Sequence, residues 1–156
     1  MQPEKNKIKT IICWLLVFIC MAVIFWLSSR TADESSQQSG FLLQWLIDRF
    51  GDNFFTDFVV RKLAHFLEFT GLCLLFNIAL WQTKQKKMPV LSVVCTSVYA
   101  ASDEIHQLFV EGRSCQFTDW LLDTAGAAAG TIGFLIIFAT VTAIIKQKNT
   151  IDTGNN

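Results

Sequence analysis

Charged residues are scarce in this chain. Asp, Glu, Lys and Arg make up 17% of its 156 residues, whereas 52% of the residues are hydrophobic and 14 are Phe. A soluble domain of this size carries about a quarter of charged residues, so the composition argues against an ordinary soluble fold. The chain is therefore expected to be a small integral membrane protein whose first partner is the lipid bilayer.

Several chemical signatures are also missing. The five cysteines are odd in number and only Cys115 lies outside an apolar run, so no disulfide framework is expected. The other cysteines are expected to pack as small hydrophobic residues. The sequence has no glycine-rich phosphate loop and no recognisable Ser or Cys nucleophile elbow. These absences argue against an ATP-driven cytoplasmic activity, and no nucleic-acid partner is expected.

The apolar runs predict an all-α polytopic membrane protein with a bundle of four transmembrane helices. The predicted spans cover about residues 8–27, 63–81, 89–110 and 120–145, and each is close to the ~20 residues that cross the hydrocarbon. The first run is too long for the apolar centre of a signal peptide, which is ~7 to 15 residues, so it is expected to remain as a span. Residues 1–156 are expected to form a single domain.

The distribution of Lys predicts the orientation of the bundle. Most Lys residues precede the first span, fill the loop after the second or follow the fourth, so they fall on one side of a four-span arrangement. Most acidic residues fall on the other side. The positive-inside rule then places both termini in the cytoplasm. The Lys residues on the predicted inner side are Lys5, Lys7, Lys9, Lys84, Lys86, Lys87, Lys146 and Lys148.

The segment between the first two spans, residues 28–61, is expected on the outer side. A polar stretch at residues 31–40 is followed by a mixture of aromatic, aliphatic and acidic residues. This mixture predicts a helix that lies in the headgroup region with its apolar side down. A strand, or a subdomain that caps the bundle, is the alternative, and in each case the segment covers the outer end of the spans.

Ionisable residues gather near the outer ends of the last three spans. An ionisable group at the centre of a membrane helix costs roughly 2.5 to 3.5 kcal/mol, so these residues need partners or a function. Helical spacing places Arg61, His65 and Glu68 on one face of the second span. With the neighbouring neutral residue Gln107, the full set of candidates is Arg61, Lys62, His65, Glu68, Asp103, Glu104, His106, Gln107, Arg113, Asp119 and Asp123.

The convergence of these residues predicts a polar pocket that opens to the outer leaflet. The alternative is that they pair with one another only to hold the bundle together, since buried ion pairs add little net stability but are costly to break. In a binding pocket, Arg61, Lys62 and Arg113 would neutralise an anionic headgroup such as a phosphate. The other binding candidates are Gln107, Asp119 and Asp123.

An enzyme is the competing mechanism for the same pocket. His65 or His106 would act as a general base or metal ligand, in a hydrolysis or transfer reaction. The carboxylate would come from one of three residues, Glu68, Asp103 or Glu104. A zinc site needs three or four ligands of defined geometry, and no metal site is predicted.

Small residues line one face of the fourth span. Gly126, Gly130 and Gly133 form a stripe that lets two helix backbones approach closely. Packing against the second or third span is expected. Homodimerisation is the alternative, and a monomer is favoured.

Motifs along the chain resemble the VanZ-like family. They lie at residues 25–29, 61–71, 102–113 and 119–130, in the order expected for that family. The resemblance covers roughly residues 20–135, and Arg30 departs from it where a Gln is expected after the paired serines.

The resemblance implies a multi-pass protein of the bacterial cytoplasmic membrane. The founding member of the family is associated with resistance to teicoplanin, a lipoglycopeptide antibiotic that acts at the cell surface. A cell-envelope lipid, a lipid-linked envelope precursor or a lipoglycopeptide is therefore the expected ligand. Neither the residues nor the resemblance identifies a cofactor.

Overall fold

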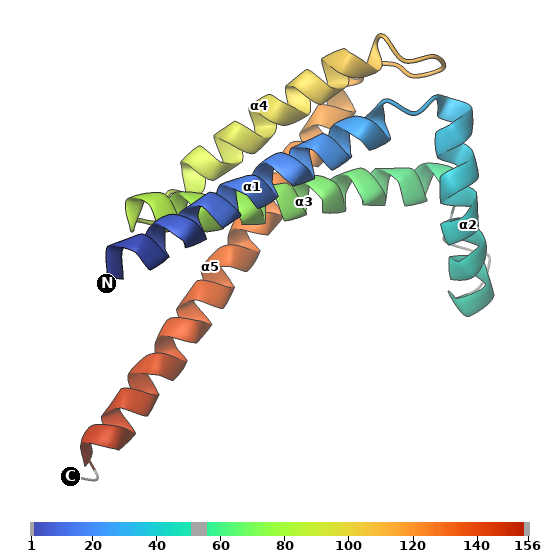
Figure 1. The fold of residues 1–156 in the computed structure, drawn as a ribbon. Coiled ribbons are helices and arrows are strands. Elements are labelled where there is room, and N and C mark those ends of the chain that lie inside the picture. Colours follow the sequence, from blue (N-terminus) through green and yellow to red (C-terminus); the bar gives the residue numbers. More distant parts are fainter. Residues whose placement is uncertain (1, 51–55, 155–156) are drawn as a thin grey trace.

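The computed structural model of the chain describes residues 2–50 and 56–154 (Figure 1). These residues form helices and no strand, so the all-α prediction is confirmed for this part of the chain. The helices are α1 (Gln2–Ser28), α2 (Ala32–Phe50), α3 (Asp57–Lys84), α4 (Pro89–Gln107) and α5 (Phe117–Gly154).

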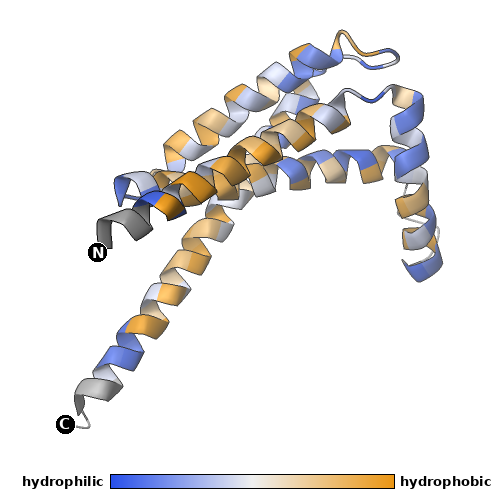
Figure 2. Cartoon of the chain, viewed as in Figure 1, coloured by the Kyte–Doolittle hydropathy of each residue, from blue (hydrophilic) through white to orange (hydrophobic). Residues whose placement is uncertain are grey.

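Three of the helices are long and apolar enough to cross a membrane, over Lys7–Ser28, Asp57–Lys84 and Phe117–Thr150. The hydrophobic residues are concentrated along α1 and α5 (Figure 2). Many of their large apolar side chains are exposed, including Phe18, which is 61% exposed, and Ile136, which is 60% exposed. Helices that are apolar on several faces are typical of membrane spans, where lipid covers the outward side chains.

The predicted third span differs from the helix that the structure shows. α4 has 19 residues and is not among the three apolar helices described above. It ends at Gln107, three residues before the predicted limit, and the chain continues as turns. The Glu104 carboxylate accepts a hydrogen bond at 2.8 Å from the backbone N–H of Gln116, which holds the returning chain over the end of the helix. The count of four spans therefore stays a prediction.

α3 is the central helix and packs against each of the other four. A buried apolar core joins α1, α3 and α4, with Val17, Phe69, Leu72 and Ala100 all fully buried. The first part of α5 completes this bundle, whereas its C-terminal part extends away from the other helices (Figure 1). The bundle is thus held mainly through contacts with α3.

The small-residue stripe packs inside one chain. A Cβ atom on Gly126 would collide with the Phe66 carbonyl oxygen, and one on Gly130 with the Thr70 carbonyl oxygen. Gly133 has open space at its Cβ position, so its inclusion in the contact stripe was wrong. The two helices cross rather than run parallel (Figure 1), and beyond Gly130 the contact passes to Thr131, which accepts a hydrogen bond from Asn77 at 3.0 Å.

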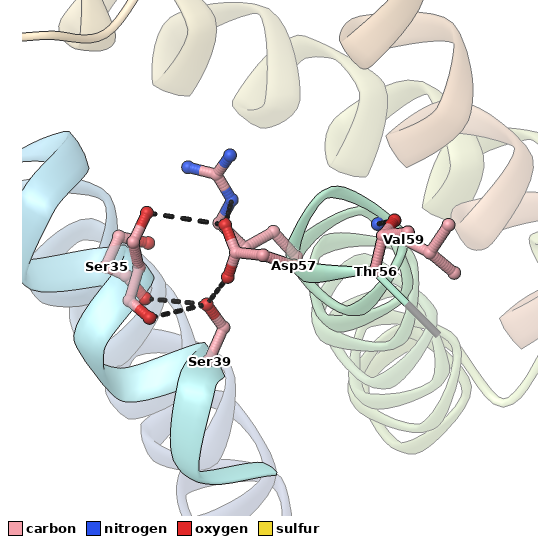
Figure 3. Close-up of polar contacts among 7 residues, drawn as sticks. Ser35, Ser39, Thr56, Asp57 and Val59 are labelled. Atoms are coloured by element: carbon pink, nitrogen blue, oxygen red, sulfur yellow. Dashed lines mark hydrogen bonds and ion pairs between the residues drawn. The ribbon is translucent and has the colours of Figure 1, made fainter. Parts of the chain in front are cut away.

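The segment between α1 and α3 forms α2, which includes most of the polar stretch at residues 31–40. Asp57, in the first turn of α3, accepts hydrogen bonds from Ser39 and, at 3.3 Å, from Ser36, so α2 is fastened beside the start of α3 (Figure 3). Thr56 caps the same turn by accepting from the N–H of Val59 at 3.3 Å. The alternative of a strand is wrong for the described residues, and Phe54 and Phe55 lie outside them.

Candidate functional site

The candidate site lies at the polar end of the bundle, defined as the end where α1 and α4 finish and α3 and α5 begin. The N-terminus and the connection between α3 and α4 lie at the opposite end (Figure 1). Antiparallel neighbours therefore bring the polar turns of three helices together, as the sequence predicted from its alternating spans.

A polar cavity of about 200 Å³ opens at this end. α3 and α5 supply most of its charged side chains, and the turn between α4 and α5 supplies the rest. The predicted site residues in its wall are Arg61, Lys62, His65, Gln107, Arg113, Asp119 and Asp123.

A second cavity of about 210 Å³ lies between α2 and α3, and we call it the amphipathic cavity. Polar residues of α2 and the carboxylate of Glu68 line it together with apolar side chains. The two cavities share three wall residues, Arg61, His65 and Arg113. They are therefore neighbouring compartments of one site, divided by two cations and an imidazole.

The three cations of the site have different partners. Lys62 forms an ion pair with Asp119 that joins α3 to α5. Arg61 pairs with Asp57, its neighbour one turn earlier, through Nε at 3.2 Å. Arg113 forms no ion pair among the residues described, and its Nε donates to the Arg30 carbonyl oxygen at 2.9 Å.

Arg113 is a cation in an environment that disfavours its charge. Burial and, after it, the nearby charge of Arg61 lower the pKa of Arg113 below its ordinary value, and the surrounding carboxylates only partly oppose this shift. A guanidinium keeps its proton under these conditions. An added anion near Arg113 would therefore stabilise the charged form and relieve its repulsion from Arg61.

Two predicted carboxylates lie behind the cavities rather than in their walls. Asp103 is 2% exposed and accepts from Ser28 at 2.8 Å and from Gln107 at 3.2 Å, which joins α1 to α4. Glu104 is 3% exposed and holds the turn before α5 through Gln116. The alternative that the polar residues only hold the bundle together thus explains one carboxylate oxygen of Asp103 and one of Glu104.

Asp123 differs from these two carboxylates. It is 1% exposed, it forms part of the wall of the polar cavity, and neither of its carboxylate oxygens has a hydrogen-bond partner in the described part of the chain. Buried polar groups without partners are rare in folded proteins, and each needs an explanation.

The two histidines are separated by the structure. His65 lies in the wall that the cavities share, with Nδ1 at 4.0 Å from the Glu68 carboxylate. His106 lines neither cavity. Its ring stacks on Phe25 with centroids 4.4 Å apart, and its Nε2 lies 3.0 Å from the Ser29 hydroxyl, so these contacts with α1 turn it away from the site.

His65 and Glu68 lie within electrostatic range of each other but beyond hydrogen-bond distance, and the cations beside them could hold an anion. Within the described residues no group of three or more His, Cys, Asp or Glu side chains is placed to hold a metal ion.

Some residues that shape the site were not predicted. Ser28 supports Asp103, and Asp57 and Ser39 fasten α2 beside the amphipathic cavity. The available signals were the paired serines at the end of the first span and the spacing of one helical turn between Asp57 and Arg61.

Comparison with known proteins supports the motif resemblance. A family model described as VanZ/LLP1 matches residues 13–139, which include all of the site residues described above. No curated protein and no solved structure matches the chain. The match covers most of the sequence and includes the polar ends of α1, α3, α4 and α5. The chain therefore belongs to the VanZ/LLP1 family and is a VanZ-like membrane protein.

Proposed function

We propose that this protein binds the anionic headgroup of a cell-envelope lipid or lipid-linked precursor at the polar end of its bundle. The observation that carries the proposal is the position of Arg113, which lies in the wall of both cavities and has no ion-pair partner among the described residues. A guanidinium in this state offers a phosphate two parallel N–H donors.

The other two cations support the same ligand chemistry. Lys62 and Arg61 are each held by one carboxylate, Asp119 and Asp57, so they are fixed in place beside Arg113. A phosphate between them would interact with three positive charges and would compete with two partly exposed ion pairs. The Arg61–Asp57 pair is the more exposed of the two, with side chains 35% and 34% exposed. Exposed pairs contribute only about 0 to 1 kcal/mol, so this pair is the easier one to exchange for a phosphate.

The amphipathic cavity favours a lipid over a free phosphate. Leu27, Leu42, Val60 and Ala64 line it beside the shared cations. A lipid with its phosphate at the shared wall would place apolar atoms against these residues. α2 also exposes Phe41 (88%) and Trp45 (60%), which suits a helix at the membrane interface.

The size of the cavities limits the ligand. Pockets for drug-sized ligands are usually about 300 to 1,000 Å³. Each cavity here is about 200 Å³, which suits a headgroup and not a whole lipoglycopeptide. We therefore favour the lipid or lipid-linked precursor among the expected ligands.

The orientation belongs to the same proposal. Four spans with both termini in the cytoplasm would place the polar end at the outer face of the bacterial cytoplasmic membrane. Lowered susceptibility to teicoplanin would then follow from binding a lipid of the surface where this antibiotic acts.

A membrane-embedded hydrolase or transferase is the second candidate. It is favoured by the position of His65 and Glu68 in the wall of the amphipathic cavity, beside the proposed phosphate position. Mass spectrometry of the lipid before and after incubation with the protein separates the two candidates. Unchanged lipid supports binding alone, whereas a new headgroup species supports catalysis.

The direct test uses the purified protein in phosphatidylcholine nanodiscs, with phosphatidylglycerol titrated and bound lipid counted by native mass spectrometry. Arg113→Gln should weaken binding about tenfold, because hydrogen bonds to charged groups are worth about 1.5 to 3 kcal/mol. Arg49→Gln is the matched control, since this exposed Arg of α2 lines neither cavity. Equal binding by Arg113→Gln and the wild type would refute the proposed function.

A further inference from the structure

Asp123 is the residue of the polar cavity that anion binding does not explain. Its side chain is 1% exposed and both carboxylate oxygens lack a hydrogen-bond partner in the part of the chain that the structure describes. A phosphodiester has no hydrogen to donate to these oxygens, so a site for a bare phosphate does not account for them. The burial of Asp123 nevertheless costs free energy, because the solvation by water is lost and no donor replaces it.

The nearby donors are directed elsewhere. Lys62 donates to Asp119, and the Gln107 amide donates to Asp103 at 3.2 Å. Both donors lie in the same cavity wall as Asp123. The wall thus combines cations that suit a phosphate with one buried acceptor that has no donor.

We infer that the ligand of the polar cavity carries a hydroxyl or ammonium group beside its phosphate, and that Asp123 accepts a hydrogen bond from this group. The inference rests on the proposed function and specifies its ligand class. Phosphoglycerol and phosphoethanolamine headgroups have this chemistry, with the donor a few bonds from the phosphorus. The phosphate lies at the shared wall near Arg113, and the donor-bearing end enters the polar cavity.

This arrangement gives each charged group of the site a separate role. Arg113 and Arg61 recognise the phosphate, as any anionic phospholipid would require. Asp123 discriminates among phospholipids, because a buried acceptor left unpaired penalises a ligand that lacks the donor. The site is therefore selective for the headgroup substituent as well as for negative charge.

The test compares lipids that share one negative phosphodiester and differ in the donor. Phosphatidylglycerol carries hydroxyl groups beyond the phosphate, whereas phosphatidylethanol carries only an ethyl group. Phosphatidylethanolamine tests the ammonium form of the donor. With wild-type protein in phosphatidylcholine nanodiscs, we expect phosphatidylglycerol and phosphatidylethanolamine each to bind about tenfold more tightly than phosphatidylethanol.

The variant experiment assigns this preference to one residue. Asp123→Leu, which keeps the branched shape and removes the acceptor, should reduce the preference to less than about threefold without weakening the binding of phosphatidylethanol. Asp48→Leu is the matched control, because Asp48 is exposed, accepts from Gln44 within α2 and lines neither cavity. A full preference retained in Asp123→Leu would overturn the inference.

The lipid series remains informative if Asp123→Leu does not fold, because it uses the wild-type protein. Equal binding of phosphatidylglycerol, phosphatidylethanolamine and phosphatidylethanol overturns the inference while the proposed function stands. No binding of any of these lipids overturns both. Soluble glycerol 3-phosphate, added as a competitor, distinguishes a lipid headgroup from a soluble phosphate as the ligand. Weak competition supports a lipid. If glycerol 3-phosphate competes with the same affinity as phosphatidylglycerol, the ligand is a soluble phosphate that carries the same donor group.

Discussion

The contact between α3 and α5 can be tested by adding a single methyl group to α5. In Gly130→Ala the new Cβ would collide with the Thr70 carbonyl oxygen, and Thr70 lies in the middle of α3. The carbonyl belongs to helix backbone and cannot rotate away, so the two helices must separate locally. In Gly133→Ala the new Cβ meets nothing within 4 Å.

The difference between these two variants isolates the packing penalty. Each replaces a helical Gly by Ala, which favours the helix by up to about 1 kcal/mol. Overpacking a close contact costs about 1 to 3 kcal/mol. The helix preference is common to both variants, so Gly130→Ala should be about 1 to 3 kcal/mol less stable than Gly133→Ala.

The assay is unfolding of the detergent-solubilised protein by titration with sodium dodecyl sulfate, followed by far-ultraviolet circular dichroism. Equal unfolding free energies for the two variants would refute the close approach of α5 to α3. A difference that disappears on dilution of the protein would assign the stripe to contact between two copies, which is the alternative considered from the sequence.

Three further predictions concern the polar end. Ser39→Ala removes the hydrogen bond to Asp57 in the first turn of α3, so amide hydrogen exchange within α2 should rise about fivefold while that of α5 stays constant. Unchanged exchange in α2 would argue against this attachment of α2 to α3. Ser28→Ala removes a donor from a buried carboxylate and should lower the unfolding free energy by about 1 to 3 kcal/mol, whereas Ser29→Ala, at an exposed position, should cost less than about 1 kcal/mol. Equal losses would argue against a buried hydrogen bond. In a background without the other native cysteines, exposed Cys115 should react with an impermeant thiol reagent on intact protoplasts, and Gln85→Cys in the same background without Cys115 should not. The reverse pattern would invert the proposed orientation.

The sequence alone was sufficient to predict the helices and the end of the bundle where the polar residues meet. Hydropathy and helical spacing are local properties, and they placed the ends of α1 and α3 and the start of α5 within three residues of their observed limits. The starts of α1 and α3 lie six residues before the predicted limits, and α5 continues nine residues beyond its predicted end. The turn that carries Gly112 was also predictable, and this glycine adopts a φ of 74°, a conformation that residues with a Cβ rarely adopt. α4 ends three residues before its predicted limit, and the contact between Glu104 and Gln116 in the turn that follows is one that hydropathy does not report.

The tertiary structure decided which polar residues act together. Spacing along α4 could not show that Asp103 is supported by Ser28 or that His106 stacks on Phe25 of α1, since these partners are 75 and 81 residues away in the chain. The same applies to Arg113, which reaches both cavities from a turn held against the connection between α1 and α2. There the Glu111 carbonyl oxygen accepts from the N–H of Ala32 at 3.2 Å, and Arg113 donates to the Arg30 carbonyl oxygen. The sequence determined the polar composition of the site, because composition does not depend on the fold. The crossing of distant helices decided which groups are paired and left both carboxylate oxygens of Asp123 without a donor in the described chain, because pairing depends on three-dimensional approach and not on spacing.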